Sequence, residues 1–130
     1  SLGKKLYLRV SDLTKINKKP VVQLDTDIKK VIVEISENML GVTAVIDQNK
    51  VVGIITDGDL RRMLMKADSF HGLTAKDIMS KHPKTISNNA MAVEAIEIMD
   101  KNGITQIIAV DNGIYCGIVH IHNLTNEGIL

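Results

Sequence analysis

The sequence contains two copies of one pattern, and this duplication constrains the fold more than any other feature. The copies align without a gap over residues 38–60, at a constant spacing of 64 positions such as that from Asn38 to Asn102. So regular a spacing indicates a repeated structural unit. Upstream of this stretch the spacing drifts by one position, which indicates short insertions in the loops. The clearest pairs are Pro20 and Pro83, Gly53 and Gly117, Leu60 and Leu124, and Asp12 and Asp77.

Each copy predicts the element order strand, helix, strand, strand, helix. The helix is predicted where apolar residues recur at intervals of three and four, and the strands where β-branched apolar residues follow one another. In the first copy these are an extended segment 20–24, a helical stripe of Ile28, Val31, Ile32 and Ile35, strands 42–46 and 51–55, and a helix 58–66. In the second copy they are an extended segment 84–86, a stripe of Ala92, Ala95, Ile96 and Met99, strands 106–110 and 114–119, and a short helix around Leu124.

A single unit of this kind leaves one apolar face of its sheet uncovered, and a second copy can cover it. We therefore expect an α/β (α+β) fold in which two strand-helix-strand-strand-helix repeats are related by a pseudo-twofold axis. The expected boundaries are a linker over residues 1–9, a first repeat over 10–68 and a second over 74–130. Thr74 and Asp77 have capping-box spacing, so a helical turn is predicted to open the second repeat.

Charge and composition exclude several classes of function. With 16 basic and 15 acidic residues the net charge is +1, which gives no reason to expect nucleic acid or an anionic membrane as a partner. The apolar runs are too short to span a bilayer. The single cysteine, Cys116, cannot form an internal disulfide, so a reducing, cytoplasmic location is expected. It lies within an apolar strand and is interpreted as a small core residue.

Aromatic residues are scarce, and the predicted core is aliphatic. Such a core buries less area per residue than one containing rings, so we expect the module to gain from a partner surface, as a homodimer or docked on another domain. Met99 is expected to fill the core. Met63, Met65 and Met79 are candidates for the inter-repeat or dimer surface.

The segment from Val52 to Arg62, which reads VGIITDGDLRR, resembles the motif of the cystathionine-β-synthase (CBS) domain. The doubled copy and the order of elements resemble the same family over nearly the whole chain. In that family the segment contributes to a nucleotide-binding cleft between paired repeats. The resemblance therefore implies a non-catalytic regulatory module.

A narrower resemblance points to the arabinose-5-phosphate isomerases. Residues 1–13 resemble the junction between the sugar-isomerase domain and the CBS pair of those enzymes, and residues 56–62 and 75–79 resemble their versions of the CBS motifs. This resemblance implies a catalytic domain located before Ser1, in an enzyme that supplies Kdo for lipopolysaccharide or capsule synthesis. It suggests AMP, ADP, ATP or CMP-Kdo as a regulatory ligand, with no required cofactor.

The residue types of this segment independently permit a ligand site. Thr56 lies where a strand passes into a helix, so its hydroxyl and nearby N–H groups can bind an anion. The Asp59 carboxylate can accept hydrogen bonds from a ribose diol, and Arg61 and Arg62 can pair with phosphate. The alternative is purely structural: Thr56 caps the helix, and Asp57 and Asp59 favour its dipole.

The second repeat departs from this chemistry. Thr56 corresponds to His120 and Asp59 to Asn123, and no arginine pair follows, so a second cleft at His120 and Asn123 is doubtful and one competent site is expected. By family geometry the partner residues in the second repeat are Lys84, Thr85, Ile86, Ile104 and Thr105. The histidines have no ligand partners at zinc spacing, so no metal site is predicted.

Three functions remain open from the sequence. The first is a ligand-sensing regulatory module, and the second is a structural module that holds isomerase subunits together without binding a small molecule. The third, a free-standing enzyme, is the weakest, because no catalytic triad, carboxylate pair or phosphate-binding loop is present.

Overall fold

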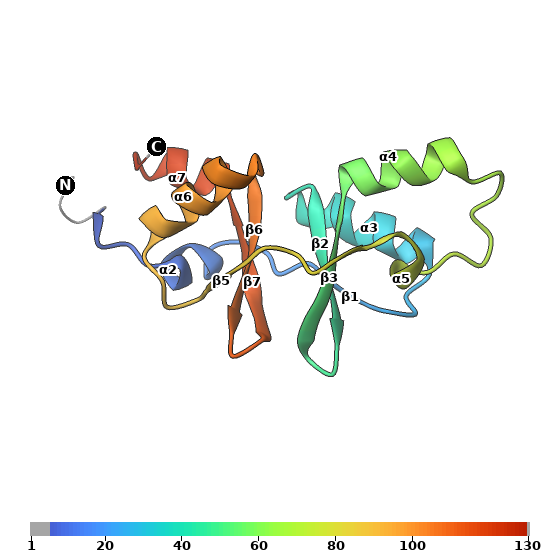
Figure 1. The fold of residues 1–130 in the computed structure, drawn as a ribbon, viewed down its shortest axis with the longest axis horizontal. Helices are drawn as coiled ribbons and strands as arrows, with labels where there is room; N and C mark the ends of the chain where they lie inside the picture. The colour runs from blue at the N-terminus through green and yellow to red at the C-terminus, as the bar shows by residue number, and fades with distance from the viewer. Residues whose placement is uncertain (1–5, 130) are drawn as a thin grey trace. The chain divides into compact units, whose positions relative to one another are not determined.

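The chain folds into two units whose boundary does not follow the order of the repeats. The computed structural model describes residues 6–129 (Figure 1). One unit, here the continuous unit, is Pro20–Pro83. The other, the discontinuous unit, combines the chain up to Lys19 with the chain from Lys84 onward. The strand-helix-strand-strand-helix part of each repeat therefore lies in one unit, but the opening segment of each repeat, which includes residues 10–19 or 74–83, belongs to the unit that holds the other repeat.

The continuous unit is built around a βαβ crossover. Strand β1 (Val21–Gln23) runs parallel to β2 (Val42–Asp47), and β2 runs antiparallel to β3 (Lys50–Thr56). Helix α3 (Ile28–Asn38) connects the parallel pair, and helix α4 (Asp57–Lys66) follows β3 directly. The short helix α5 (Ala75–Ile78) and strand β4 (Ser80–Lys81) complete the unit, with β4 antiparallel to β3.

The discontinuous unit repeats this arrangement. Strand β5 (Thr85–Ser87) is parallel to β6 (Gln106–Asp111), which is antiparallel to β7 (Ile114–His120). Helix α6 (Ala92–Asn102) makes the crossover and ends at Gly103, whose φ of 62° is the left-handed conformation that glycine adopts at low cost. Helix α7 (Ile121–Asn126) closes the repeat, and helix α2 (Val10–Thr14) packs against β7 and α6.

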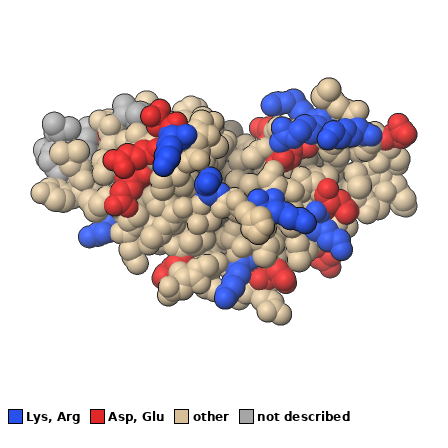
Figure 2. Space-filling view, viewed as in Figure 1, with Lys and Arg blue, Asp and Glu red and all other residues tan. Residues whose placement is uncertain are grey.

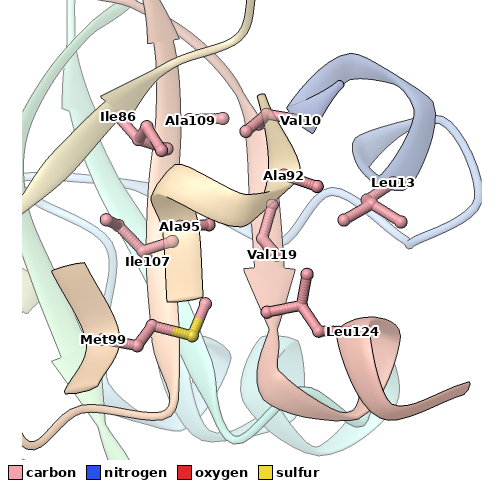
Figure 3. Packing of buried hydrophobic residues seen from close by; sticks show 10 residues of the cluster. All are labelled: Val10, Leu13, Ile86, Ala92, Ala95, Met99, Ile107, Ala109, Val119 and Leu124. Atoms are coloured by element: carbon pink, nitrogen blue, oxygen red, sulfur yellow. The ribbon is translucent and has the colours of Figure 1, made fainter. Parts of the chain in front are cut away.

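The core of each unit is completed by a short helix that lies outside the strand-helix-strand-strand-helix part of that unit, namely α2 in one and α5 in the other. In Figure 3, Val10 and Leu13 of α2 lie among buried residues of the second repeat, including Ala92 and Val119. In the continuous unit, Ala75 of α5 is buried in the corresponding cluster. Helices α2 and α5, which open the first and the second repeat along the chain, are thus exchanged. Helix α2 covers the core formed by the second repeat, and α5 covers the core formed by the first.

Two equivalent glycines permit this close packing. A Cβ on Gly53 would lie 2.5 Å from the Met79 Sδ atom, just after α5. A Cβ on Gly117 would lie 3.0 Å from the Cβ of Thr14, at the end of α2. Both glycines pair across the sheet with the residue at which a β-bulge begins, Val45 and Ala109. The sequence repeat at Gly53 and Gly117 therefore reflects the need for an opening helix to approach the sheet.

The predicted strands and helices are present, with ends that differ by no more than three residues. Helix α2 and strand β4 are additional elements, too short to produce a periodic pattern. The expectation for Met63 was wrong, because this side chain is buried in the continuous unit's core, whereas Met65 is 85% exposed. Met99 fills the core as predicted, and Cys116 is half-buried against the core cluster of the discontinuous unit.

Candidate ligand site at the start of helix α4

Thr56 and Asp59 form a reciprocal cap at the start of α4. The Thr56 hydroxyl accepts a hydrogen bond from the Asp59 backbone N–H at 3.2 Å, and the Asp59 Oδ2 atom accepts one from the Thr56 N–H at 2.9 Å. The Thr56 hydroxyl also donates to Oδ2 at 3.2 Å. Thr56 and Asp59 therefore cap the helix, as the structural alternative from the sequence predicted. The pair satisfies backbone N–H donors that the start of a helix leaves free.

The other oxygen of Asp59 is held from two further directions. Arg62 donates to Oδ1 at 2.6 Å, one helical turn along α4, and the Ser80 hydroxyl donates to it at 3.1 Å from strand β4. Asp59 is only 6% exposed, so its charge is largely shielded from water. A buried carboxylate is costly unless it is paired and hydrogen-bonded, and these contacts meet that requirement.

These contacts use the full hydrogen-bonding capacity of Asp59. An ionised carboxylate offers about four acceptor positions, and the four donated hydrogen bonds from Thr56, Arg62 and Ser80 occupy them. A ribose diol can bind Asp59 only by displacing one of these donors. The most easily displaced is Arg62, because its side chain is 61% exposed and is held by a single ion pair.

The neighbouring charged residues face solvent. Asp57 and Arg61 are exposed, and the Asp57 backbone N–H donates to the Gly41 carbonyl at 3.1 Å. An Asp in the first turn favours the helix dipole, so Asp57 has a structural explanation. Arg61 has no ion pair among residues 6–129 and is available to an anion.

The second repeat has the same cap with different chemistry. Asn123 Oδ1 accepts from the His120 N–H at 2.7 Å, and His120 Nδ1 accepts from the His122 N–H at 3.1 Å. Asn123 is also joined to Asn17 by two amide hydrogen bonds of 2.9 and 3.1 Å, and Asn17 donates to the Ile118 carbonyl at 2.7 Å. These hydrogen bonds use the amide group of Asn123 and give this residue a structural role that the sequence did not reveal.

His120 is held in its neutral form. An Nδ1 atom that accepts from a backbone N–H cannot carry a proton, and the ring centroids of His120 and His122 lie 4.5 Å apart. Burial, and secondarily the neighbouring His122, lower the pKa of His120 below its ordinary value of 6.5. His120 is therefore poorly suited to bind a phosphate at neutral pH.

The remaining predicted residues lie in the discontinuous unit. Lys84 and Thr85 are exposed at the start of β5, whereas Ile86 points into the core and can offer only main-chain groups. Ile104 and Thr105 line a hollow of about 640 Å³ between the end of α6 and the start of α7. The structure therefore groups the predicted residues as one set on α4 and another on β5 and the approach to β6.

Several groups have no chemical role in this arrangement. Burial raises the pKa of the Cys116 thiol, which disfavours the reactive thiolate. Among residues 6–129 no three potential ligands are close enough to hold a metal ion. Within the same range no helix has both the length and the apolar character to cross a membrane.

Comparison with known proteins agrees with this architecture. The sequence profile of the CBS domain matches residues 10–66 and 75–128. Arabinose 5-phosphate isomerase KdsD from Francisella tularensis is 45% identical over 127 residues, which cover 95% of this chain and 38% of that protein. The chain thus spans well under half the length of this relative.

Solved structures share the fold at lower sequence identity. A CBS domain protein from Pyrobaculum aerophilum, PAE2072, complexed with AMP, has a TM-score of 0.78 and 22% identity, with 90% of each chain covered. CBSX2, in complex with AMP, has a TM-score of 0.75 and 20% identity, with 94% of this chain and 96% of that one covered. The chain, with its two matched repeats, belongs to the CBS domain family.

Proposed function

We propose that this chain is the regulatory part of an arabinose 5-phosphate isomerase and binds an adenine nucleotide or CMP-Kdo at the start of α4. The observation that carries the proposal is the buried Asp59 carboxylate, held by an exposed and displaceable arginine, Arg62. The similarity to KdsD and the AMP complexes of proteins with this fold support it. The isomerase reaction itself requires residues outside this chain.

Binding in this proposal exchanges one partner of Asp59 for another. The Arg62 guanidinium leaves Oδ1 and pairs with the ligand phosphate, for which its planar donors are suited. The vacated position on Oδ1 then accepts a ribose hydroxyl, and the buried carboxylate remains satisfied. Arg61 adds a second cation. In the same proposal Lys84, Thr85, Ile86, Ile104 and Thr105 of the other repeat contribute the remaining contacts.

The equivalent position in the second repeat lacks these properties. Asn123 carries no charge and is paired with Asn17, and His120 is neutral. No arginine stands on α7. We therefore propose one ligand site per chain, at Thr56 and Asp59.

Thermal denaturation of the 130-residue chain tests the proposal. AMP, ADP, ATP, CMP and CMP-Kdo are added in turn, and a ligand at about 100 times its dissociation constant stabilises the folded state by about 2.7 kcal/mol. We expect at least one of these ligands to stabilise the folded chain. In the Arg62→Ala variant we expect a higher dissociation constant for that ligand, since binding is weaker. Absence of any shift at millimolar concentrations contradicts the proposal.

Asp77 provides a matched control for the role of Asp59. It occupies the same capping-box position on α5, and the N–H and hydroxyl of Thr74 hold its pKa below the ordinary value. Both Asp59→Asn and Asp77→Asn alter a cap, but only the first removes the charge at the proposed site. Ligand binding retained in Asp59→Asn would move the site elsewhere.

A second candidate function is assembly, in which the chain holds isomerase subunits together as a homodimer. Large apolar side chains are exposed on the helices of the continuous unit, with Val33 50%, Leu64 57% and Met65 85% exposed. Large apolar side chains left exposed on helices support this candidate, because contiguous exposed apolar surface is typical of an interaction site. Sedimentation velocity of the chain tests this function, and a monomer at every concentration contradicts it.

A further inference from the structure

Strand β1 lies at a sheet edge whose outward N–H groups are covered by side chains. The Val21 N–H donates to a Glu34 carboxylate oxygen at 2.9 Å, and the Gln23 N–H donates to the Thr26 hydroxyl at 2.9 Å. An edge strand presents such N–H groups unpaired unless another group covers them. Glu34 of α3 and Thr26 of the turn before it therefore close the edge of β1.

Strand β5 is the equivalent edge strand of the second repeat. It pairs with β6 in the same register as β1 with β2, at positions 64 residues later. Thr85 therefore stands where Val21 stands, and Ser87 where Gln23 stands. The N–H of the next residue, Asn88, donates to a β6 carbonyl at 2.8 Å. Because successive N–H groups of a strand point to opposite sides, those of Thr85 and Ser87 point away from β6.

The residues that cover the edge of β1 are changed in the second repeat. Glu34 is replaced by Ile98, which packs against the core of the discontinuous unit, and Thr26 is replaced by Ala90. Neither replacement side chain can accept a hydrogen bond. Within residues 6–129 the two outward N–H groups of β5 have no acceptor, and the residues that carry them are exposed. The edge of β5 is thus open, whereas that of β1 is closed.

The charges of the two repeats differ in the same direction. Figure 2 shows Lys and Arg side chains gathered over α4, and Asp and Glu side chains gathered over α6. Helix α7, the counterpart of α4, contains neither Lys nor Arg and contacts α6. An anionic ligand is therefore attracted to α4 and not to α7. In the proposed function α4 and β5 serve one ligand, whereas the symmetry of the repeats would assign α7 and β1 to a second.

We propose that Glu34 and Thr26 act as built-in occupants of the β1 edge and leave β5 as the strand that binds the ligand through its main chain. A ligand at β1 must displace the Glu34 carboxylate from the Val21 N–H, which is a charge-assisted hydrogen bond. At β5 the open N–H groups donate directly to acceptor atoms of the ligand. This inference rests on the proposed ligand-binding function and adds to it the residues that decide which repeat supplies the strand.

Transfer of the two covering side chains to the second repeat tests the proposal. The closing variant of the 130-residue chain combines Ala90→Thr with Ile98→Glu. Its control combines Ala90→Val with Ile98→Met, which resemble Thr and Glu in shape but lack a strong acceptor. AMP and CMP-Kdo are each titrated into the parent chain and both variants by calorimetry. We expect the closing variant to bind about 10-fold or more weakly, because the β5 N–H groups are already occupied, and the control to bind as the parent chain does.

Amide hydrogen exchange of the unliganded chains reports the state of each edge directly. In the parent chain the amides of Val21 and Gln23 are expected to exchange more slowly than those of Thr85 and Ser87, and in the closing variant all four are expected to exchange slowly. A further variant, Thr85→Pro, removes one open N–H outright at an edge position that tolerates proline. It is expected to weaken binding whether or not the transferred side chains reach β5.

The outcomes separate this inference from the function on which it rests. A parent chain that binds neither AMP nor CMP-Kdo contradicts the ligand-binding function and the inference with it. Parent-like affinity in Thr85→Pro, or in a closing variant whose β5 amides exchange slowly, overturns the inference alone, as does equal weakening in the closing variant and its control. Thr26→Ala with Glu34→Ile leaves α4 and β5 unaltered and is expected to keep the parent affinity, so a loss of binding there would assign the ligand to β1.

Discussion

The Asp59 carboxylate and the Ser80 hydroxyl are joined by a 3.1 Å hydrogen bond that ties the start of α4 to strand β4. The same relationship holds in the other unit between Asn123 and Asn17. Ser80 and Asn17 each stand three residues before a proline, Pro83 or Pro20. In both units the segment after the opening helix thus holds the third residue of the closing helix through its side chain.

Asp59→Ala is expected to lower the free energy of unfolding by about 1–3 kcal/mol, because it removes the cap of the half-buried Thr56 N–H together with the acceptor of Arg62 and Ser80. Asp77→Ala, which removes an exposed cap of the same type, is expected to cost about 1 kcal/mol or less. Urea denaturation measures both. Equal losses for the two variants would show that the additional contacts of Asp59 contribute little.

Gly53→Ala is expected to destabilise the chain by about 1–3 kcal/mol, because its new methyl group would overlap the Met79 side chain. Met79→Ala removes the overlapping sulfur and should recover part of this loss in the double variant, as a double-mutant cycle can measure. Gly117→Ala is the comparison. Its φ of 151° disfavours any side chain, so trimming Thr14 to Ala should recover little.

Asn17→Ala is expected to cost about 1–3 kcal/mol of unfolding free energy, because the Ile118 carbonyl and the Asn123 amide both lose a partner. The double variant Asn17→Ala with Asn123→Ala should cost less than the two single losses added together. Urea denaturation of the parent chain, the two single variants and the double variant completes this double-mutant cycle. Strict additivity would mean that the two amides contribute independently.

The stability of the discontinuous unit is expected to fall on acidification through His120. Its pKa is lower in the folded chain than its ordinary value of 6.5, so the unfolded chain binds the proton more readily. The stabilisation is complete above pH 6.5 and is lost as the pH falls through the folded pKa. Urea midpoints measured between pH 8 and pH 5 should show this decline.

His120→Thr restores the residue found at Thr56 and should remove this part of the pH dependence while keeping the cap. His71→Ala, on an exposed loop, is the control and should leave the pH dependence unchanged. A pH profile that His120→Thr does not alter would assign the decline to other groups.

The sequence by itself determined the elements and their duplication. The apolar spacing of residues such as Val31 and Ile35 reports a helix that must bury one face, and that requirement is local. The capping box at Thr74 and Asp77 was predicted for the same reason, because a cap joins residues three positions apart. The CBS motif around Thr56 and Asp59 was also legible from contiguous residues.

Only the tertiary structure decided which partners the side chains of those residues bind. Ser80 and Asn17 reach Asp59 and Asn123 from 21 and 106 positions away, and no periodic pattern reports a contact of that kind. The exchange of α2 and α5 between the units depends on which core each short helix can complete, and not on the helix's own sequence. The sequence thus determined which helices and strands form, while packing between distant segments decided which polar groups are satisfied and which charges, such as those of α4 and α6, remain exposed.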